Sequence, residues 1–302
     1  MSIAENIARI RERVDRAAVR AGRDPAGIAL MAVCKTHPAE AIREAFAAGQ
    51  RLFGENRVQE FAGKAPMLGD LAGAEFHMIG HLQSNKAKSA AELFAAVDSV
   101  DSRKLAERLN AAAKAAGNVL DILIEINVGG EEAKSGVALG TRELEEMLEH
   151  AGEWTHLRLR GLMTVPPFTE DPEGARPYFR QLRELRDVIA AKGIVLDQLS
   201  MGMSHDFEVA IAEVSTCVRV GTAIFGRAFE GCAFVGYHSR RCIQPEQGDP
   251  RGRTHGRACA IAAQYCVGKR SKRWNVTSYL RRRPRHHRGR AAGRQRLAAS
   301  QG

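Results

Sequence analysis

The chain has 302 residues and a formal net charge of +10, but the positive charge is concentrated at its C-terminal end. Residues 231–302 contain 17 Lys and Arg and only 2 Asp and Glu, whereas residues 1–230 contain 28 and 33 and carry a net charge of −5. The basic composition is therefore no argument that the segment 1–230 binds nucleic acid.

No apolar segment approaches the roughly 20 residues of a membrane span, and the N-terminus has no secretory signal pattern, so we expect a cytoplasmic protein without membrane contact. Only Cys34 and Cys217 lie in the segment 1–230, which is too few for a disulfide framework and fits a reducing compartment.

The first predicted element is an amphipathic helix over residues 3–18, in which Ile3, Ile7, Ile10 and Val14 recur at steps of three and four. From residue 28 onward, short apolar segments predict strands that alternate with helical stretches. The predicted strands are 28–35, 51–56, 75–80, 93–100, 121–128, 157–165, 196–202 and 216–226. The predicted helices between them are 38–49, 56–65, 84–91, 102–116, 141–151, 172–192 and 205–213.

Strict alternation of strands and helices predicts a parallel sheet covered by helices. Eight such units within the segment 1–230 match the size of a closed (β/α)8 TIM barrel, which typically has about 250 residues. An open doubly wound sheet is the alternative, but it predicts a glycine-rich loop after the first strand, and residues 34–38 contain no glycine. We therefore predict an α/β protein in which residues 1–230 form a single (β/α)8 barrel with an extra N-terminal helix. Residues 231–302 are predicted to be a disordered basic tail.

Functional side chains of such barrels collect at the C-terminal ends of the strands, and Lys35 directly follows the first apolar segment. A lysine at the mouth of a barrel is partly desolvated, which favours the neutral amine that a Schiff base requires. The alternative is a lysine that extends to solvent or pairs with Glu55.

A phosphate-binding region is predicted after the last two strands, where barrels often bind phosphate. Ser204 is predicted to be the N-cap of the helix at 205–213, which would direct backbone N–H groups toward the barrel mouth. Gly221 allows close approach of the backbone, and Thr222 adds a hydroxyl donor. Ordinary helix capping and tight turns are the alternative.

Arg219 lies inside the apolar segment TCVRVG, and a charged residue in a buried strand must be paired or functional. A guanidinium that donates to a pyridine nitrogen would keep this nitrogen unprotonated and weaken the ring as an electron sink. The alternative is a salt bridge to a barrel carboxylate such as Glu125. No metal-binding motif is present in the segment 1–230, and Cys34 is predicted to be a small core residue.

Six segments, in this order and spacing, closely resemble those of the pyridoxal phosphate homeostasis proteins: AVCKTHP, FGENRVQE, FHMIGHLQSNK, GLMTV, LSMGMSHD and VRVGTAIFG. The resemblance covers residues 1–228. It implies a single-domain barrel that binds pyridoxal 5′-phosphate (PLP) and is similar in fold to the N-terminal barrel of alanine racemase.

By this resemblance, Lys35 forms a covalent aldimine with PLP, and Arg219 faces the pyridine nitrogen. Ser204, Gly221 and Thr222 bind the phosphate with help from the Met203 backbone. The resemblance also places three residues beside the ring, namely Asn56, His81 and Met163. No residue is assigned a catalytic or metal-binding role.

The resemblance implies a role in PLP homeostasis and in amino and keto acid balance: the protein buffers PLP and supplies it to apoenzymes without turnover of its own. We expect it to act as a monomer. A PLP-dependent amino-acid racemase is the alternative, but racemases of this fold use a second base, typically a tyrosine from a separate β domain. Tyr178, in a predicted outer helix, is the only tyrosine of the segment 1–230.

The chain departs from the family after Phe229, and we interpret the patternless tail as a frameshift read-through. The alternatives are a basic arm that binds RNA or DNA, and, less well supported by the spacing of Cys259 and Cys266, a zinc site.

Overall fold

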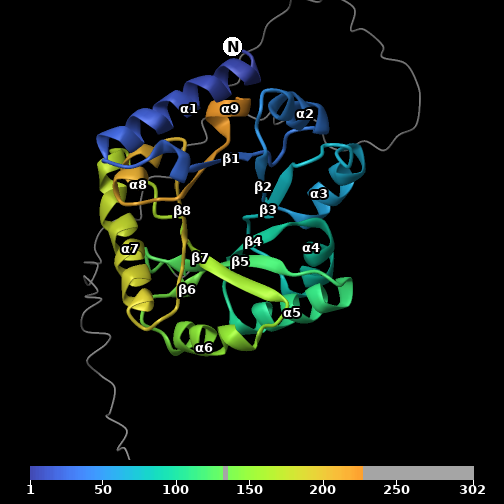
Figure 1. The fold of residues 1–302 in the computed structure, drawn as a ribbon, viewed down its shortest axis with the longest axis vertical. Helices are drawn as coiled ribbons and strands as arrows, with labels where there is room; N and C mark the ends of the chain where they lie inside the picture. The colour runs from blue at the N-terminus through green and yellow to red at the C-terminus, as the bar shows by residue number, and fades with distance from the viewer. Residues whose placement is uncertain (132–134, 227–302) are drawn as a thin grey trace, which may run out of the picture. The chain divides into compact units, whose positions relative to one another are not determined.

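The computed structural model describes residues 1–131 and 135–226, and the predictions for the tail at 231–302 lie outside these ranges. Eight parallel strands form a closed barrel, because β4 pairs with β5 at the two ends of the order β4-β3-β2-β1-β9-β8-β7-β5 (Figure 1). The predicted (β/α)8 barrel is thus confirmed. The barrel strands are β1 (Ala29–Val33), β2 (Leu52–Glu55), β3 (Glu75–Met78), β4 (Ala96–Val100), β5 (Leu120–Asn127), β7 (Leu157–Met163), β8 (Gln198–Met203) and β9 (Cys217–Val220).

The helices of the described residues form a ring around the strands (Figure 1). They are α1 (Ile3–Arg20), α2 (Ala39–Ala47), α3 (Val58–Lys64), α4 (Ala87–Leu93), α5 (Arg103–Ala116), α6 (Arg142–His150), α7 (Arg176–Ala190), α8 (Phe207–Ala212) and α9 (Thr222–Phe225). Short 3₁₀ turns occupy Pro25–Gly27, Ala65–Met67, Ser84–Lys86, Ala151–Glu153 and Pro172–Ala175. None of the described helices is long and apolar enough to cross a membrane.

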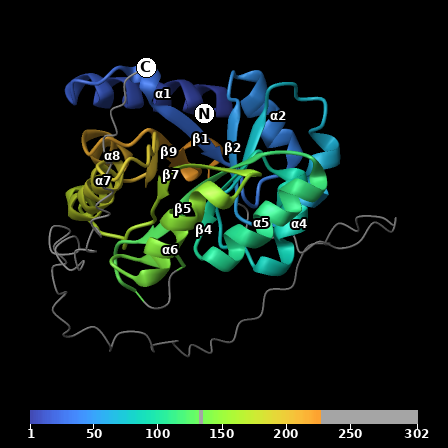
Figure 2. The ribbon, with the colours of Figure 1, turned by 60° about the horizontal axis from the view of Figure 1, so that its bottom comes forward.

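The extra N-terminal helix α1 begins with a capping box, in which Ser2 and Glu5 satisfy each other's backbone N–H groups. Its apolar stripe is buried, with Ile7, Ile10 and Val14 each at most 3 % exposed. The helix packs against α2, α8 and α9, so it covers the join between the first and the last strand of the barrel (Figures 1 and 2).

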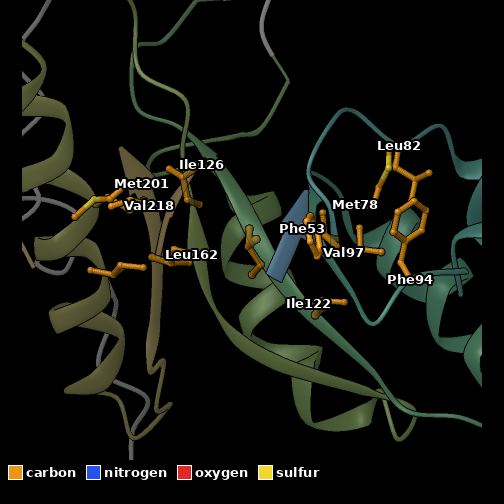
Figure 3. Packing of buried hydrophobic residues seen from close by; sticks show 14 of the residues in the cluster. Phe53, Met78, Leu82, Phe94, Val97, Ile122, Ile126, Leu162, Met201 and Val218 are labelled. Carbon is orange, nitrogen blue, oxygen red and sulfur yellow. The ribbon is translucent and has the colours of Figure 1, made fainter. Parts of the chain in front are cut away.

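The main apolar layer lies where strand side chains meet the helices. Most barrel strands contribute to it, and Figure 3 shows Phe53, Met78, Val97, Ile122, Leu162, Met201 and Val218 among its members. Side chains alternate across a strand, so the neighbours of these residues face the barrel interior. That interior holds polar groups, including Ser200 and Arg219, which are hydrogen-bonded to each other.

Two predicted strands include residues of a helix, because apolar residues alone do not distinguish a strand from a buried helix. The strand predicted at 93–100 begins only at Ala96, since Leu93 still ends α4. The strand predicted at 216–226 ends at Val220, and the apolar residues after Gly221 form α9. The short strand β6 (Val137–Ala138), which pairs with the end of β5, was not predicted.

Candidate cofactor site at the carboxyl ends of the strands

The structure brings the nine predicted site residues to one end of the barrel. Because all eight barrel strands are parallel, their carboxyl ends meet at the same end. Met163 and Met203 are the last residues of β7 and β8, and Arg219 is the next to last residue of β9. The other six follow a strand end directly or closely, namely Lys35, Asn56, His81, Ser204, Gly221 and Thr222.

Lys35 lies in a turn beyond the end of β1, and its side chain is exposed. The strand ends at Val33, two residues before Lys35. The alternative pairing with Glu55 is absent, since Lys64 holds that carboxylate at 2.9 Å. Within the described ranges, no hydrogen bond or ion pair engages the Lys35 amine, which leaves it available to a ligand.

The turn between β9 and α9 has the features of a phosphate-binding backbone. The first intrahelical bonds of α9 run from Ile224 N–H and Phe225 N–H to the Gly221 carbonyl, so the N–H groups of Thr222 and Ala223 precede them and have no acceptor within the helix. A side chain at Gly221 would place its Cβ 3.1 Å from the carbonyl oxygen of Val33, so glycine gives this close approach without a shift of the neighbouring backbone.

Ser204 is not a helix N-cap, contrary to the prediction. Helix α8 begins at Phe207, and Asp206 occupies the cap position but makes no side-chain capping bond. Instead, the Asp206 carboxylate accepts the Met203 backbone N–H at 2.6 Å, and Asp206 N–H donates to the Met203 carbonyl at 3.1 Å. The Met203 backbone, which was predicted to help bind the phosphate, thus has both its N–H and its carbonyl bonded to Asp206. Burial raises the pKa of Asp206. No described residue hydrogen-bonds the half-buried Ser204 hydroxyl, which remains a candidate donor.

Arg219 is 4 % exposed and is held by neutral oxygens. Its guanidinium donates to Ser200 Oγ and to the Thr164 carbonyl, each at 2.7 Å. Burial lowers its pKa, but a guanidinium remains charged in proteins. The alternative salt bridge to Glu125 is not formed in the described ranges, since Glu125 accepts the Ser135 hydroxyl at 3.1 Å and burial raises its pKa. Arg219 therefore presents a buried positive charge that the protein does not neutralise by direct contact.

Asn56 supplies a buried acceptor without a partner. Its Oδ1 atom has no solvent contact and no hydrogen-bond partner, and such orphaned atoms are uncommon in native proteins. Gly80 permits the packing here, because a Cβ on Gly80 would lie 2.4 Å from the Asn56 carbonyl oxygen. A ligand hydroxyl would satisfy Oδ1.

The two remaining predicted residues differ in accessibility. His81 is exposed and its Nδ1 lies 3.1 Å from Asp101 Oδ2. Met163 is completely buried, and because Leu162 belongs to the outer apolar layer, Met163 faces the barrel interior.

The sequence analysis did not identify Glu60 and Lys64, whose side chains bind the turn that contains Lys35. The pattern that could have indicated them is their (i, i+4) spacing in a predicted helix, which favours an ion pair.

A separate cavity of about 450 Å³ lies at the opposite end of the barrel. It is lined by residues at the amino ends of strands, such as Ala29, Leu52 and Glu75, and reaches the interior pair His77 and Asp98. None of the nine predicted site residues lines it, so it is distinct from the candidate site. Within the described ranges, no cluster of three or more His, Cys, Asp or Glu side chains is arranged to hold a metal ion.

The His77–Asp98 pair, 3.1 Å apart, predicts a pH-dependent stability. Burial alone lowers the pKa of His77, but the charge of Asp98 and the hydrogen bond to it outweigh burial and raise that pKa. The folded protein thus binds this proton more tightly than the unfolded chain, so the stabilisation is complete below about pH 6.5 and is lost as the pH rises through the raised pKa. We expect Asp98→Asn to lower the free energy of unfolding by about 1–3 kcal/mol at pH 6 and by less at pH 9.

Urea unfolding at the two pH values measures this difference. The control is His156→Gln, at a half-buried histidine that contacts the Asn118 carbonyl and is not part of the pair. An equal loss at both pH values would show that the His77 proton does not contribute.

Comparison with known proteins identifies the family. The model of the family described as alanine racemase, N-terminal domain, matches residues 2–228. The pyridoxal phosphate homeostasis protein of Aquifex aeolicus is 46 % identical over 227 residues, which are 75 % of this chain and 98 % of the relative. The protein of the same name from Pseudomonas aeruginosa is 47 % identical over 225 residues, 74 % of this chain and 95 % of the relative.

Solved structures agree with these matches. PipY of Synechococcus elongatus PCC7942, solved without PLP, is 39 % identical with a TM-score of 0.67 and covers 74 % of this chain and 100 % of its own. The same protein solved with PLP bound is 38 % identical with a TM-score of 0.65 and the same coverage. Alanine racemase of Streptomyces coelicolor is 20 % identical with a TM-score of 0.56, covers 75 % of this chain and 59 % of its own, and shares the fold. The chain therefore belongs to the pyridoxal phosphate homeostasis proteins, within the family of alanine racemase N-terminal domains.

Proposed function

We propose that this chain binds PLP at the carboxyl ends of its barrel strands, holds it covalently through Lys35, and buffers and supplies it in the cytoplasm without turnover of its own. The observation that carries the proposal is the meeting, at one barrel end, of an unengaged amine at Lys35 and an orphaned acceptor at Asn56. The family relative solved with PLP bound supports the choice of ligand.

The donors and acceptors present fit the chemical groups of PLP. When bound, PLP supplies an aldehyde, with which a lysine amine condenses to form a C=N bond and release one water. Lys35 provides the amine. Thr222 and Ser204 provide hydroxyls, and the N–H groups at the start of α9 provide further donors for a phosphate.

Arg219 and Asn56 fit the ring. The guanidinium of Arg219 is a permanent donor and suits an unprotonated pyridine nitrogen, because a cation there disfavours ring protonation. Asn56 Oδ1 suits the ring hydroxyl, and we place Met163 and His81 nearby. A ring that stays unprotonated stores electrons poorly, which favours storage of PLP over amino-acid chemistry.

A reservoir needs a reactive group that is held but reachable. The exposed position of Lys35 allows water or another amine to approach the C=N bond, so PLP can be released to an apoenzyme. Cys34 and Cys217, both free and buried, are consistent with a reducing cytoplasm. We expect the segment 1–230 to suffice for binding as a monomer.

Uptake of PLP by the purified protein tests the proposal. We expect a visible absorption band at one equivalent of PLP, and borohydride reduction should attach the pyridoxyl mass to the peptide that contains Lys35. Pyridoxine 5′-phosphate, which has the ring and phosphate but no aldehyde, should compete without producing the band. A protein that remains colourless with excess PLP contradicts the proposal, and rapid racemisation of L-alanine in chiral analysis would favour the racemase alternative over a reservoir.

A further inference from the structure

The backbone beside Lys35 is held in an unfavourable conformation. Thr36 has φ 64°, in the left-handed region that β-branched residues rarely occupy. Such strain persists only where the surrounding structure holds it, and it concentrates at functional sites. The contacts that hold this turn are therefore informative.

Both peptide groups that flank Lys35 are bound by one pair of side chains on α3. The Cys34 carbonyl, before Lys35, accepts a hydrogen bond from Lys64 Nζ at 3.2 Å. The Thr36 N–H, after Lys35, donates to Glu60 Oε1 at 2.5 Å, and the same oxygen accepts from Lys64 Nζ at 2.7 Å. Because each peptide unit is planar, fixing the units on both sides of a residue fixes its two backbone dihedrals.

Lys64 has no hydrogen-bonding capacity left for a ligand. An ammonium group has three donors, and those of Lys64 are used by the Cys34 carbonyl, by Glu60 and by Glu55 Oε1 at 2.9 Å. Its side chain is 10 % exposed and Glu55 is fully buried. Lys64 therefore binds neighbouring groups of the protein and has no donor left for the phosphate of a ligand.

Two acidic side chains, Glu55 and Glu60, contact the Lys64 ammonium, and their pKa values are shifted in opposite directions. Burial raises the pKa of Glu55, whose Oε2 has no partner. For Glu60, the hydrogen bonds from Lys64 and Thr36 outweigh burial and lower the pKa. For Lys64, the bonds to Glu60 and Glu55 likewise outweigh burial and raise the pKa. Glu60 and Lys64 are the two side chains that bind the peptide groups on either side of Lys35.

We propose that Lys64 and Glu60 are positioning residues, which clamp the Lys35 turn and set the direction in which the Lys35 amine is presented. The role in cofactor binding rests on the proposed function, whereas the clamp itself is a property of the protein without cofactor. Amine and aldehyde must meet in a defined geometry, and misplacement by about 1 Å costs on the order of 100-fold in rate for reacting groups. The clamp should therefore matter for PLP and not for analogues that lack the aldehyde.

The test uses Lys64→Met, which keeps most of the apolar stem, and Glu60→Gln, which keeps an oxygen near Thr36 but removes the charge. Glu60 is the safer variant for folding because its side chain is 25 % exposed. The matched control is Lys88→Met, since Lys88 is 82 % exposed on α4 and is remote in sequence from the turn. Two measurements are made on each protein.

The first measurement is amide hydrogen exchange of residues 33–37 without cofactor. We expect exchange of the Thr36 amide to accelerate by about tenfold or more in both variants and to stay unchanged in the control, because its acceptor is weakened. Unchanged protection in both variants would overturn the clamp, whether or not the protein binds PLP.

The second measurement compares the affinities for PLP and for 4′-deoxypyridoxine 5′-phosphate, which carries a methyl group in place of the aldehyde. We expect the variants to lose about tenfold or more in affinity for PLP and less than about threefold for the analogue. A parallel loss of both ligands, or no loss of either, would overturn the positioning role. If the unaltered protein binds neither ligand, the proposed function fails instead, and hydrogen exchange still decides the clamp.

Discussion

Lys35→Ala is expected to abolish the visible absorption band of the PLP-loaded protein and to weaken PLP binding by about 100-fold, which corresponds to about 2.7 kcal/mol. The variant retains the hydroxyls and N–H groups that we propose to bind the phosphate, as well as the Arg219 guanidinium, so residual binding should remain. Lys35 is exposed and its amine makes no hydrogen bond or ion pair within the described residues, so the thermal midpoint of the cofactor-free protein should not change.

Equilibrium dialysis with PLP and absorption spectra measure these effects. Lys88→Ala is the control, because this lysine is exposed on α4. A band of undiminished intensity in Lys35→Ala would mean that another lysine carries the cofactor, and the assignment of Lys35 would be wrong.

Gly161→Ala is expected to lower the free energy of unfolding by about 3–5 kcal/mol. Gly161 lies in β7 opposite Gln198 of β8, and a Cβ at this position would lie 1.9 Å from the Gln198 carbonyl oxygen. Because the obstructing atom belongs to the backbone of the neighbouring strand, relief requires the two strands to separate. The substitution therefore strains the pairing of β7 with β8, on which the closed barrel depends.

Gly63→Ala is the matched control for this prediction. Gly63 lies in α3, and a Cβ there would meet nothing within 4 Å, so the substitution should be neutral or stabilising by about 0.5–1 kcal/mol. Urea unfolding followed by circular dichroism measures both variants. Similar midpoints for the two would show that the barrel tolerates a side chain at Gly161.

The same clash argument explains why the glycines of the candidate site were only partly interpretable beforehand. Close approach of the backbone at Gly221 was predicted, and the atom that it approaches is the Val33 carbonyl oxygen. The equivalent constraint at Gly80 depends on Asn56, which follows the preceding barrel strand, and no local pattern reveals such a partner. Contacts of this kind arise from the pairing of strands and not from the order of residues.

Local patterns did determine much of this protein. The alternation of apolar segments with amphipathic helices predicted the eight barrel strands, and the residues at strand ends predicted which side chains meet. In a parallel barrel the carboxyl ends of all strands lie at the same end. A residue that directly follows a strand can therefore be placed at that end from the sequence alone. The motif set predicted the family that the comparisons identified.

Tertiary structure alone decided the partners of these side chains. Ser204 was expected to cap α8, but Asp206 occupies the cap position and its carboxylate accepts the Met203 N–H. Glu125 was the alternative partner of Arg219, but Ser200 and Thr164 hold the guanidinium. Lys35 is exposed just beyond its strand, and the turn around it is bound by the buried Lys64, which the sequence did not single out. Hydrogen bonds between side chains depend on distances of a few tenths of an ångström between distant segments, and these distances are set by the packing of the whole barrel. The sequence thus determined that Lys35 stands at the mouth of the barrel, and the tertiary structure decided what holds it there.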